Sequence, residues 1–162
     1  MAAAAASSSS SDKAAGRVLL PSNITPTRYD IQLTPDLSAF TFAGVTTIEL
    51  TTGPDVSSSK ITLHAKELCF ASASYTIKSE GQSPSEEKKH EAEEISTNTK
   101  STTVTFGFTT PIPPDATLLL TIHYTGFLNN QMAGFYRSSY TDIHGTKKIM
   151  ASTQFESLDA RR

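Results

Sequence analysis

Alternating apolar and polar positions recur along most of the chain, and this two-residue period predicts β-strands. In the first run, Tyr29, Ile31 and Leu33 point to one side and polar residues point to the other. Further strands are predicted over 40–50, 61–65, 68–78, 104–108 and 118–124, separated by turns rich in proline and glycine. We therefore predict an all-β fold, with a single domain built as an antiparallel β-sandwich or a curved, saddle-like sheet.

The run over residues 40–50 changes its parity in the middle. In a regular strand, Phe40, Phe42, Ile48 and Leu50 would point to one side, whereas Val45 would point to the other. Gly44 stands at the break. Because an extra residue in one strand shifts parity by one, we expect a β-bulge at Gly44.

Two segments depart from the simple alternation. Residues 79–100 hold six glutamates and three lysines, and we expect an exposed acidic insertion with one weak strand near Ile95. Residues 126–162 are rich in Tyr, Asn, Gln, Arg and Gly. That composition is typical of side chains chosen for specific contacts, although an irregular loop would have a similar one.

Length and composition limit the domain count and the partners. A chain of 162 residues fits one domain. Residues 1–17 are nearly all Ala and Ser and are expected to form a disordered tail, with the domain over 18–162. The net charge of −2 without a basic stripe argues against a nucleic-acid partner. With no signal peptide, no long apolar run and only Cys69, we expect no membrane partner and a cytoplasmic location.

The residues alone contain no complete active site. The histidines are His64, His90, His123 and His144, and no two are spaced four apart as a helical zinc motif requires. Strand parity predicts that His64 and His123 face the solvent. Neither a nucleophile elbow nor a phosphate-binding loop is present. We therefore expect no catalytic residue, no metal ligand and no cofactor in this chain.

Several motifs nevertheless resemble one enzyme family. They are Leu20-Pro21, Thr25-Pro26, Tyr29–Leu33 and Phe40–Gly44, followed by Asn129–Tyr140 and Met150–Arg162, in this order. The chain resembles, over roughly residues 18–162, the amino-terminal domain of zinc aminopeptidases of the puromycin-sensitive and aminopeptidase N type, which are gluzincin metallopeptidases. The resemblance is least over 79–100.

The resemblance implies a function and its limits. In that family a zinc ion activates water to remove amino-terminal residues from peptides, and the zinc ligands, the general base and the catalytic tyrosine lie in a following domain. This chain would therefore be the amino-terminal domain, truncated before the catalytic domain and inactive alone. Zinc would belong to the full-length parent, whose catalytic domain is the expected partner.

The resemblance also assigns substrate-binding residues. Glu156 matches the glutamate that binds the free α-amino group of the peptide substrate, and Gln154 matches a residue lining the pocket for the first side chain. A carboxylate suits an ammonium group because it accepts charge-assisted hydrogen bonds. Tyr136, Arg137 and Tyr140 are expected to pack at the interface with the catalytic domain.

Two other interpretations stay open at this stage. The chain could be a non-catalytic β-sandwich that binds peptides or proteins, including a truncated form that interferes with the full-length enzyme. It could also lack an independent role and fold poorly, because loss of a partner domain exposes apolar surface. An end at Asp159–Arg162, inside a family signature, favours the truncated enzyme module.

Overall fold

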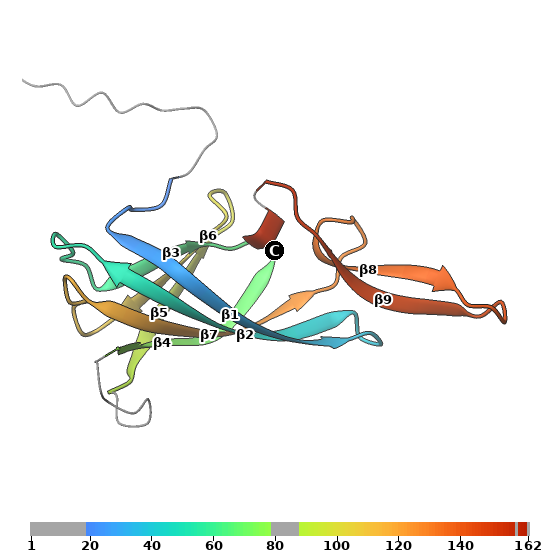
Figure 1. Ribbon diagram of the computed structural model, residues 1–162, viewed down its shortest axis with the longest axis horizontal. Helices are drawn as coiled ribbons and strands as arrows, with labels where there is room; N and C mark the ends of the chain where they lie inside the picture. Colours follow the sequence, from blue (N-terminus) through green and yellow to red (C-terminus); the bar gives the residue numbers. More distant parts are fainter. Residues whose placement is uncertain (1–18, 79–87, 158, 162) are drawn as a thin grey trace, which may run out of the picture.

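The computed structural model describes residues 19–78, 88–157 and 159–161. These residues form nine β-strands and one short 3₁₀ turn (Figure 1). The elements are β1 (Ile24–Asp36), β2 (Thr41–Thr52), β3 (Lys60–His64), β4 (Leu68–Ile77), β5 (His90–Asn98), β6 (Thr103–Phe108), β7 (Thr117–Phe127), β8 (Gly134–Thr141), β9 (Lys147–Gln154) and η1 (Asp159–Arg161).

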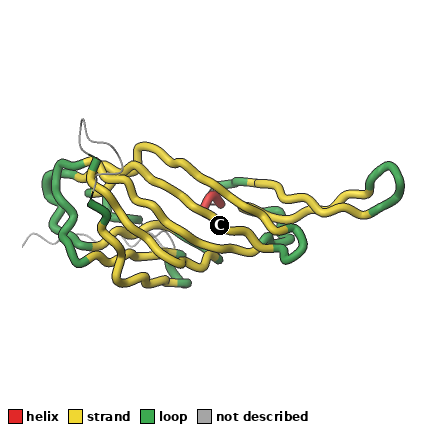
Figure 2. Tube along the Cα trace, turned by 90° about the horizontal axis from the view of Figure 1, so that it is seen from below, coloured by secondary structure: helices red, strands yellow, loops and turns green. Residues whose placement is uncertain are grey.

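Seven of the strands form one antiparallel sheet in the order β1-β2-β7-β4-β5-β6-β3. The sheet curls, so that its two end strands, β1 and β3, approach each other across an open side (Figures 1 and 2). Strands β8 and β9 pair only with each other and form a hairpin that projects away from the sheet (Figure 1). The all-β prediction is confirmed, in its curved-sheet form.

The core lies on the inner face of this curl. Strand β7 shows the expected alternation, because Leu118, Leu120 and Ile122 are buried while the residues between them are less so. Tyr75 and Phe106 are the bulkiest fully buried side chains. Removing each such side chain from water stabilises the fold by about 1.5–3 kcal/mol, which makes this face the principal source of stability.

The parity change in β2 has a different cause from the predicted bulge. Pairing is continuous at Gly44, which lies opposite Leu33 on one side and Tyr124 on the other. Thr46 takes the inward position, only 8% exposed, and its hydroxyl lies 2.9 Å from the Tyr124 hydroxyl. The bulge prediction is therefore wrong, since a hydrogen-bonded threonine occupies an inward position that the pattern assigned to an apolar residue.

The two irregular segments contain more strand than the sequence predicts. The strand expected near Ile95 extends from His90 to Asn98 and pairs with both β4 and β6. The 126–162 segment contains the β8–β9 hairpin. The rest of the acidic segment, residues 79–87, and the proposed tail, residues 1–17, lie outside the described residues. In the part that is described, no helix is long and apolar enough to cross a membrane.

Contacts at its root fix the hairpin to the sheet. The Arg137 guanidinium donates a hydrogen bond to the Leu128 carbonyl and lies 4.5 Å from the centre of the Phe40 ring. The Phe135 ring meets the Phe42 ring edge-on, with centroids 5.1 Å apart. Arg137 thus makes its contacts within this chain, and the expectation that it also packs at an interface with a following domain stays a prediction.

The turn η1 folds back onto the end of β3. The Arg161 guanidinium donates a hydrogen bond to the Thr102 hydroxyl at 2.8 Å and lies 3.5 Å from Nδ1 of His64. The Lys66 amide donates to the Arg161 carbonyl at 2.8 Å. His64 is therefore partly covered, and the prediction that it faces solvent is wrong. The reason is that β3 ends at His64, where the Arg161 side chain packs beside the imidazole ring.

We predict that Gly44→Ala destabilises the chain by about 1–3 kcal/mol in urea unfolding. A Cβ at this position would lie 2.4 Å from the Tyr124 ring, which β2 and β7 hold in place. Gly53→Ala is the matched control, because its Cβ would meet only the Asn23 carbonyl at 3.7 Å. Equal stability of the two variants would contradict the close packing of β2 on β7.

Arg161→Ala is predicted to loosen η1 without unfolding the sheet. The Lys66 amide, which donates to the Arg161 carbonyl, should exchange its hydrogen at least about fivefold faster, as loss of a ~1 kcal/mol hydrogen bond implies. The Ala65 amide donates to the Thr102 carbonyl instead and serves as the internal control. Unchanged exchange at Lys66, followed by NMR, would show that the guanidinium does not hold the turn.

Candidate functional site

The two residues assigned by resemblance lie at the root of the projecting hairpin. Gln154 is the last residue of β9 and pairs with Gly134, the first residue of β8. Glu156 follows two residues later, and both side chains are exposed. The hairpin root is also where Phe135 and Arg137 attach β8 to the sheet. These polar groups therefore lie on an anchored part of the hairpin rather than at its tip.

Gln154 and Glu156 differ from their neighbours in their relation to a groove beside this segment. Thr153 and Phe155 line a groove on the inner face of the sheet, whereas Gln154 and Glu156 do not. In an extended chain, residues two apart point to the same side and are separated by about 6.5 Å. The amide and the carboxylate therefore lie two residues apart in the chain, and neither lines the groove.

The backbone around Glu156 is held by a reciprocal pair of hydrogen bonds. The Glu156 amide donates to the Asp159 carboxylate, and the Asp159 amide donates to the Glu156 carbonyl, both at 3.1 Å. This pairing fixes the direction in which the Glu156 side chain leaves the backbone. Among the described residues, no side chain forms a hydrogen bond or ion pair with its carboxylate, and the residue is exposed.

An exposed carboxylate binds a cation weakly by itself. Water screens the attraction, so an isolated surface pair contributes about 0–1 kcal/mol. The same carboxylate becomes an effective ammonium receptor once other groups exclude water, because the attraction grows as the local dielectric constant falls. The geometry therefore offers one element of an amine-binding site, and its strength depends on what covers it.

The fit of a metal ion to these residues can be tested directly. Over residues 19–78, 88–157 and 159–161, no group of three or more His, Cys, Asp and Glu side chains is placed to hold a metal. His123 is exposed on β7 and His64 contacts Arg161, so the two do not form a site. The described residues do not fit a zinc centre, and no chemical step through zinc is assigned to them.

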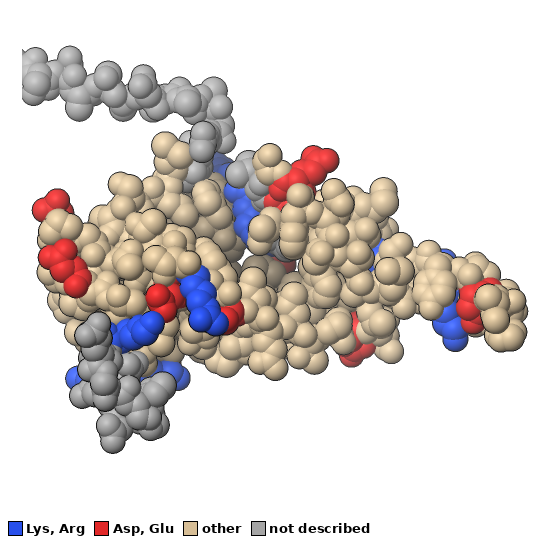
Figure 3. Space-filling model, viewed as in Figure 1, with Lys and Arg blue, Asp and Glu red and all other residues tan. Residues whose placement is uncertain are grey.

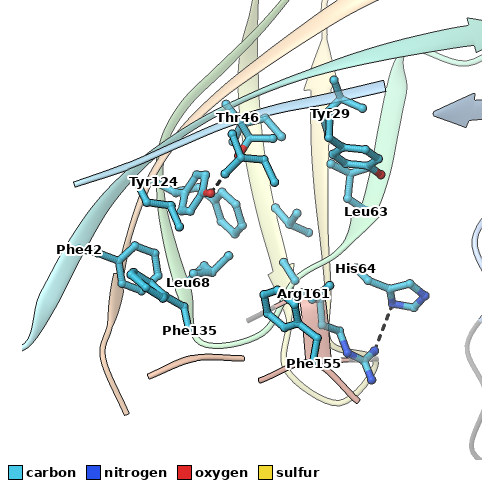
Figure 4. A pocket seen from close by; sticks show the side chains of 18 of the residues that line it. Tyr29, Phe42, Thr46, Leu63, His64, Leu68, Tyr124, Phe135, Phe155 and Arg161 are labelled. Atoms are coloured by element: carbon cyan, nitrogen blue, oxygen red, sulfur yellow. Dashed lines mark hydrogen bonds between the residues drawn. The ribbon is translucent and has the colours of Figure 1, made fainter. Parts of the chain in front are cut away.

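Sequence reasoning did not predict a groove that the structure shows. A groove of about 700 Å³ lies between β1 and β3, on the inner face of the curled sheet (Figure 4). Its lining is mostly apolar and includes Tyr29, Ile31, Leu63, Phe70 and Phe155. The alternation in β1 indicated an inward side but not that this side lacks a cover. The groove exists because the curl does not close, and only tertiary structure reveals that.

Charged side chains do not form a continuous basic stripe on the face that Figure 3 presents, where Lys and Arg lie among Asp and Glu. Several pairs are close, including Lys78 with Glu49 at 2.9 Å and Lys89 with Glu91 at 2.7 Å. The hydrogen bond from Lys78 lowers the pKa of the Glu49 carboxyl. The visible charges are thus largely balanced locally, in keeping with the small net charge of the chain.

Comparison with known proteins places this geometry in a family. Residues 25–162 match the family model of the Peptidase M1 N-terminal domain. The chain is 41% identical over 149 residues to the alanine/arginine aminopeptidase of Saccharomyces cerevisiae, covering 90% of this chain and 16% of that protein. It is 39% identical over 155 residues to aminopeptidase M1 of Arabidopsis thaliana, covering 93% and 16%.

A third relative is the puromycin-sensitive aminopeptidase of Caenorhabditis elegans, 37% identical over 142 residues, with 88% of this chain and 14% of that protein covered. The chain therefore spans about a sixth of the length of these relatives. The match extends from β1 to the turn that carries Glu156 and Arg161. By its family match and by identities of 37–41%, this chain belongs to the Peptidase M1 N-terminal domain family, found in aminopeptidases.

Proposed function

We propose that this chain is the amino-terminal domain of a zinc-dependent aminopeptidase and that Glu156 binds the α-amino group of the peptide substrate. The observation that carries the proposal is the exposed Glu156 carboxylate, held on a backbone that two hydrogen bonds with Asp159 fix. Gln154 lies two residues before it and would contact the first side chain of the peptide.

In this proposal the domain contributes recognition and the rest of the enzyme contributes chemistry. Zinc, held elsewhere in the full-length enzyme, supplies activated water for peptide hydrolysis. The catalytic domain is the partner that covers Glu156 and excludes water, which turns a weak exposed carboxylate into a selective receptor for an ammonium group. The isolated chain is accordingly inactive towards peptides.

The role of recognition follows from where the charge lies along a substrate. A peptide with a free amino terminus carries its positive charge next to the first peptide bond. A carboxylate at a fixed distance from the reacting bond therefore selects the first bond over internal bonds, and an internal peptide segment leaves that carboxylate unpaired in a dry site. Glu156 would thus determine exopeptidase selectivity.

A chimera provides the test, with residues 19–161 replacing the aligned segment of the yeast alanine/arginine aminopeptidase. We expect Glu156→Gln to lower kcat/KM on an amino-terminal alanine substrate about 10- to 100-fold, because a charge-assisted hydrogen bond is lost. KM should rise and kcat should fall together. Discrimination against the N-acetylated form of the same substrate should also decrease.

Glu93→Gln is the matched control, since it removes the same charge from an exposed position on β5. Its kinetics should equal those of the unmodified chimera. An active chimera in which Glu156→Gln leaves kcat/KM and amine discrimination unchanged would refute the assignment. Hydrolysis of the same substrate by the isolated chain would refute the proposal that the catalytic groups lie in the other domain.

A further inference from the structure

Two residues with a left-handed backbone mark the place where η1 attaches to the sheet. Thr102, in the turn between β5 and β6, has a φ of 50°, and Glu67, between β3 and β4, has a φ of 59°. A positive φ is costly for residues other than glycine, and most of all for a β-branched residue such as threonine. Thr102 is therefore held in this conformation by what it contacts.

The two turns together form one binding surface for Arg161. The Ala65 amide donates a hydrogen bond to the Thr102 carbonyl at 2.9 Å, which ties the turns to each other. The Arg161 guanidinium donates to the Thr102 hydroxyl, and the Arg161 carbonyl accepts from the Lys66 amide, both at 2.8 Å. His64 lies at the same place, with Nδ1 3.5 Å from the guanidinium (Figure 4). We call His64, Lys66 and Thr102 the anchor site.

The Thr102 hydroxyl is oriented to accept a hydrogen bond from Arg161. It donates its own hydrogen to the Ser101 carbonyl at 2.8 Å. A hydroxyl has one hydrogen and two lone pairs, so only the lone pairs remain for a second partner. A guanidinium has donors and no acceptor, which makes it the complement of such a hydroxyl. The pairing of Thr102 with Arg161 is thus chemically matched.

From Arg161 the connection continues along η1 to Glu156. Asp159 is the first residue of η1 and Arg161 is the last, so the two belong to one 3₁₀ turn. The Asp159 carboxylate accepts from the Glu156 amide, and the Glu156 carbonyl accepts from the Asp159 amide. Each link between Thr102 and Glu156 is therefore a hydrogen bond or a short piece of backbone. A displacement of η1 would move the Glu156 carboxylate with it.

Stability alone does not account for threonine at position 102. Glycine adopts a positive φ without strain, and it would keep the backbone hydrogen bond from Ala65. The hydroxyl is what threonine adds, and Arg161 is the group that binds it. Strain of this kind persists where the contact that it permits has a function.

We propose that Thr102, Arg161 and Asp159 are positioning residues for recognition of the α-amino group of the substrate, and that they act through Glu156 without touching the substrate. This inference rests on the proposed function, in which Glu156 binds that group. It assigns the placement of the carboxylate to the anchor site, at the end of β3. Placement matters because a displacement of about 1 Å can slow an enzymatic reaction about 100-fold.

Thr102→Gly separates this role from a purely structural one, because it relieves the backbone and removes the hydroxyl. The urea midpoint of the chain should stay the same or rise. In the yeast chimera, kcat/KM on the amino-terminal alanine substrate should fall about tenfold, since the Glu156 carboxylate is less well placed. Discrimination against the N-acetylated substrate should fall as well. Thr102→Ser keeps the hydroxyl and should restore both kinetic values.

Asp115→Gly is the matched control, because Asp115 also has a positive φ, of 48°, and is exposed. It precedes β7, whereas the anchor site adjoins Leu68, which pairs with Gly126 near the other end of that strand. Its kinetics should equal those of the unmodified chimera. A loss of kcat/KM as large as that of Thr102→Gly, or a midpoint that falls in Thr102→Gly alone, would show general damage and overturn the proposal.

A double variant shows whether Thr102 acts through Glu156. If it does, Thr102→Gly has no further effect once the carboxylate is gone, and the double variant should have the kcat/KM of Glu156→Gln alone. Two independent losses would multiply instead and would overturn the proposal. Unchanged kinetics in Thr102→Gly, in a chimera that Glu156→Gln impairs, would also overturn it and would leave the proposed function intact.

Hydrogen exchange in the isolated chain, followed by NMR, separates this outcome from that of the proposed function. In Thr102→Gly the Glu156 amide, which donates to Asp159, should exchange at least about fivefold faster. The Gly145 amide at the hairpin tip donates to the Asp142 carbonyl and should not change. Faster exchange at Glu156, with a chimera insensitive to Glu156→Gln, would keep the connection and remove its role in recognition. Unchanged exchange at Glu156 would overturn the proposal even if the chimera does not fold.

Discussion

An exchange of aromatic rings between β2 and β7 is the constraint on which the rest of the structure depends. Gly44 on β2 lies opposite Tyr124 on β7, and Phe42 on β2 lies opposite Gly126 on β7. At each glycine a Cβ would lie 2.4 Å from the facing ring. Each strand therefore has a glycine where the ring from the facing strand packs closely, and a residue with a Cβ would prevent this packing.

This exchange positions both the groove and the root of the hairpin. The Tyr124 hydroxyl reaches Thr46 and closes the floor of the groove, and the Phe42 ring continues outwards to meet Phe135 at the hairpin root. The hairpin in turn carries Gln154 and directs the chain to Glu156. Gln154 and Glu156, the residues proposed to bind substrate, are thus connected to the centre of the sheet through two ring contacts.

The strands with one buried face could be predicted from the sequence, because burial imposes a two-residue period that β7 and most of β2 show clearly. The β8–β9 hairpin could not be predicted in this way. Most positions on both of its faces are at least partly exposed, so its sequence shows no two-residue alternation of apolar and polar residues. Strand β5 is similar, with most of its residues exposed. The bulge predicted at Gly44 is wrong because the local pattern of residues does not reveal the Tyr124 ring, which lies on the neighbouring strand β7. Glu156 came from a family resemblance, and nothing in its local pattern distinguishes it from a surface acid.

The projecting hairpin acts mechanically as a lever. Its strands of eight residues extend for about 26 Å, so a 10° rotation at the root would move the tip, where Ile143 is 95% exposed, by about 4–5 Å. The same rotation would displace a group next to the root by less than about 1 Å. Gln154 and Glu156 lie close to the pivot and Ile143 lies far from it. A rotation at the root would therefore move the tip of the hairpin by several ångströms and leave Gln154 and Glu156 almost stationary.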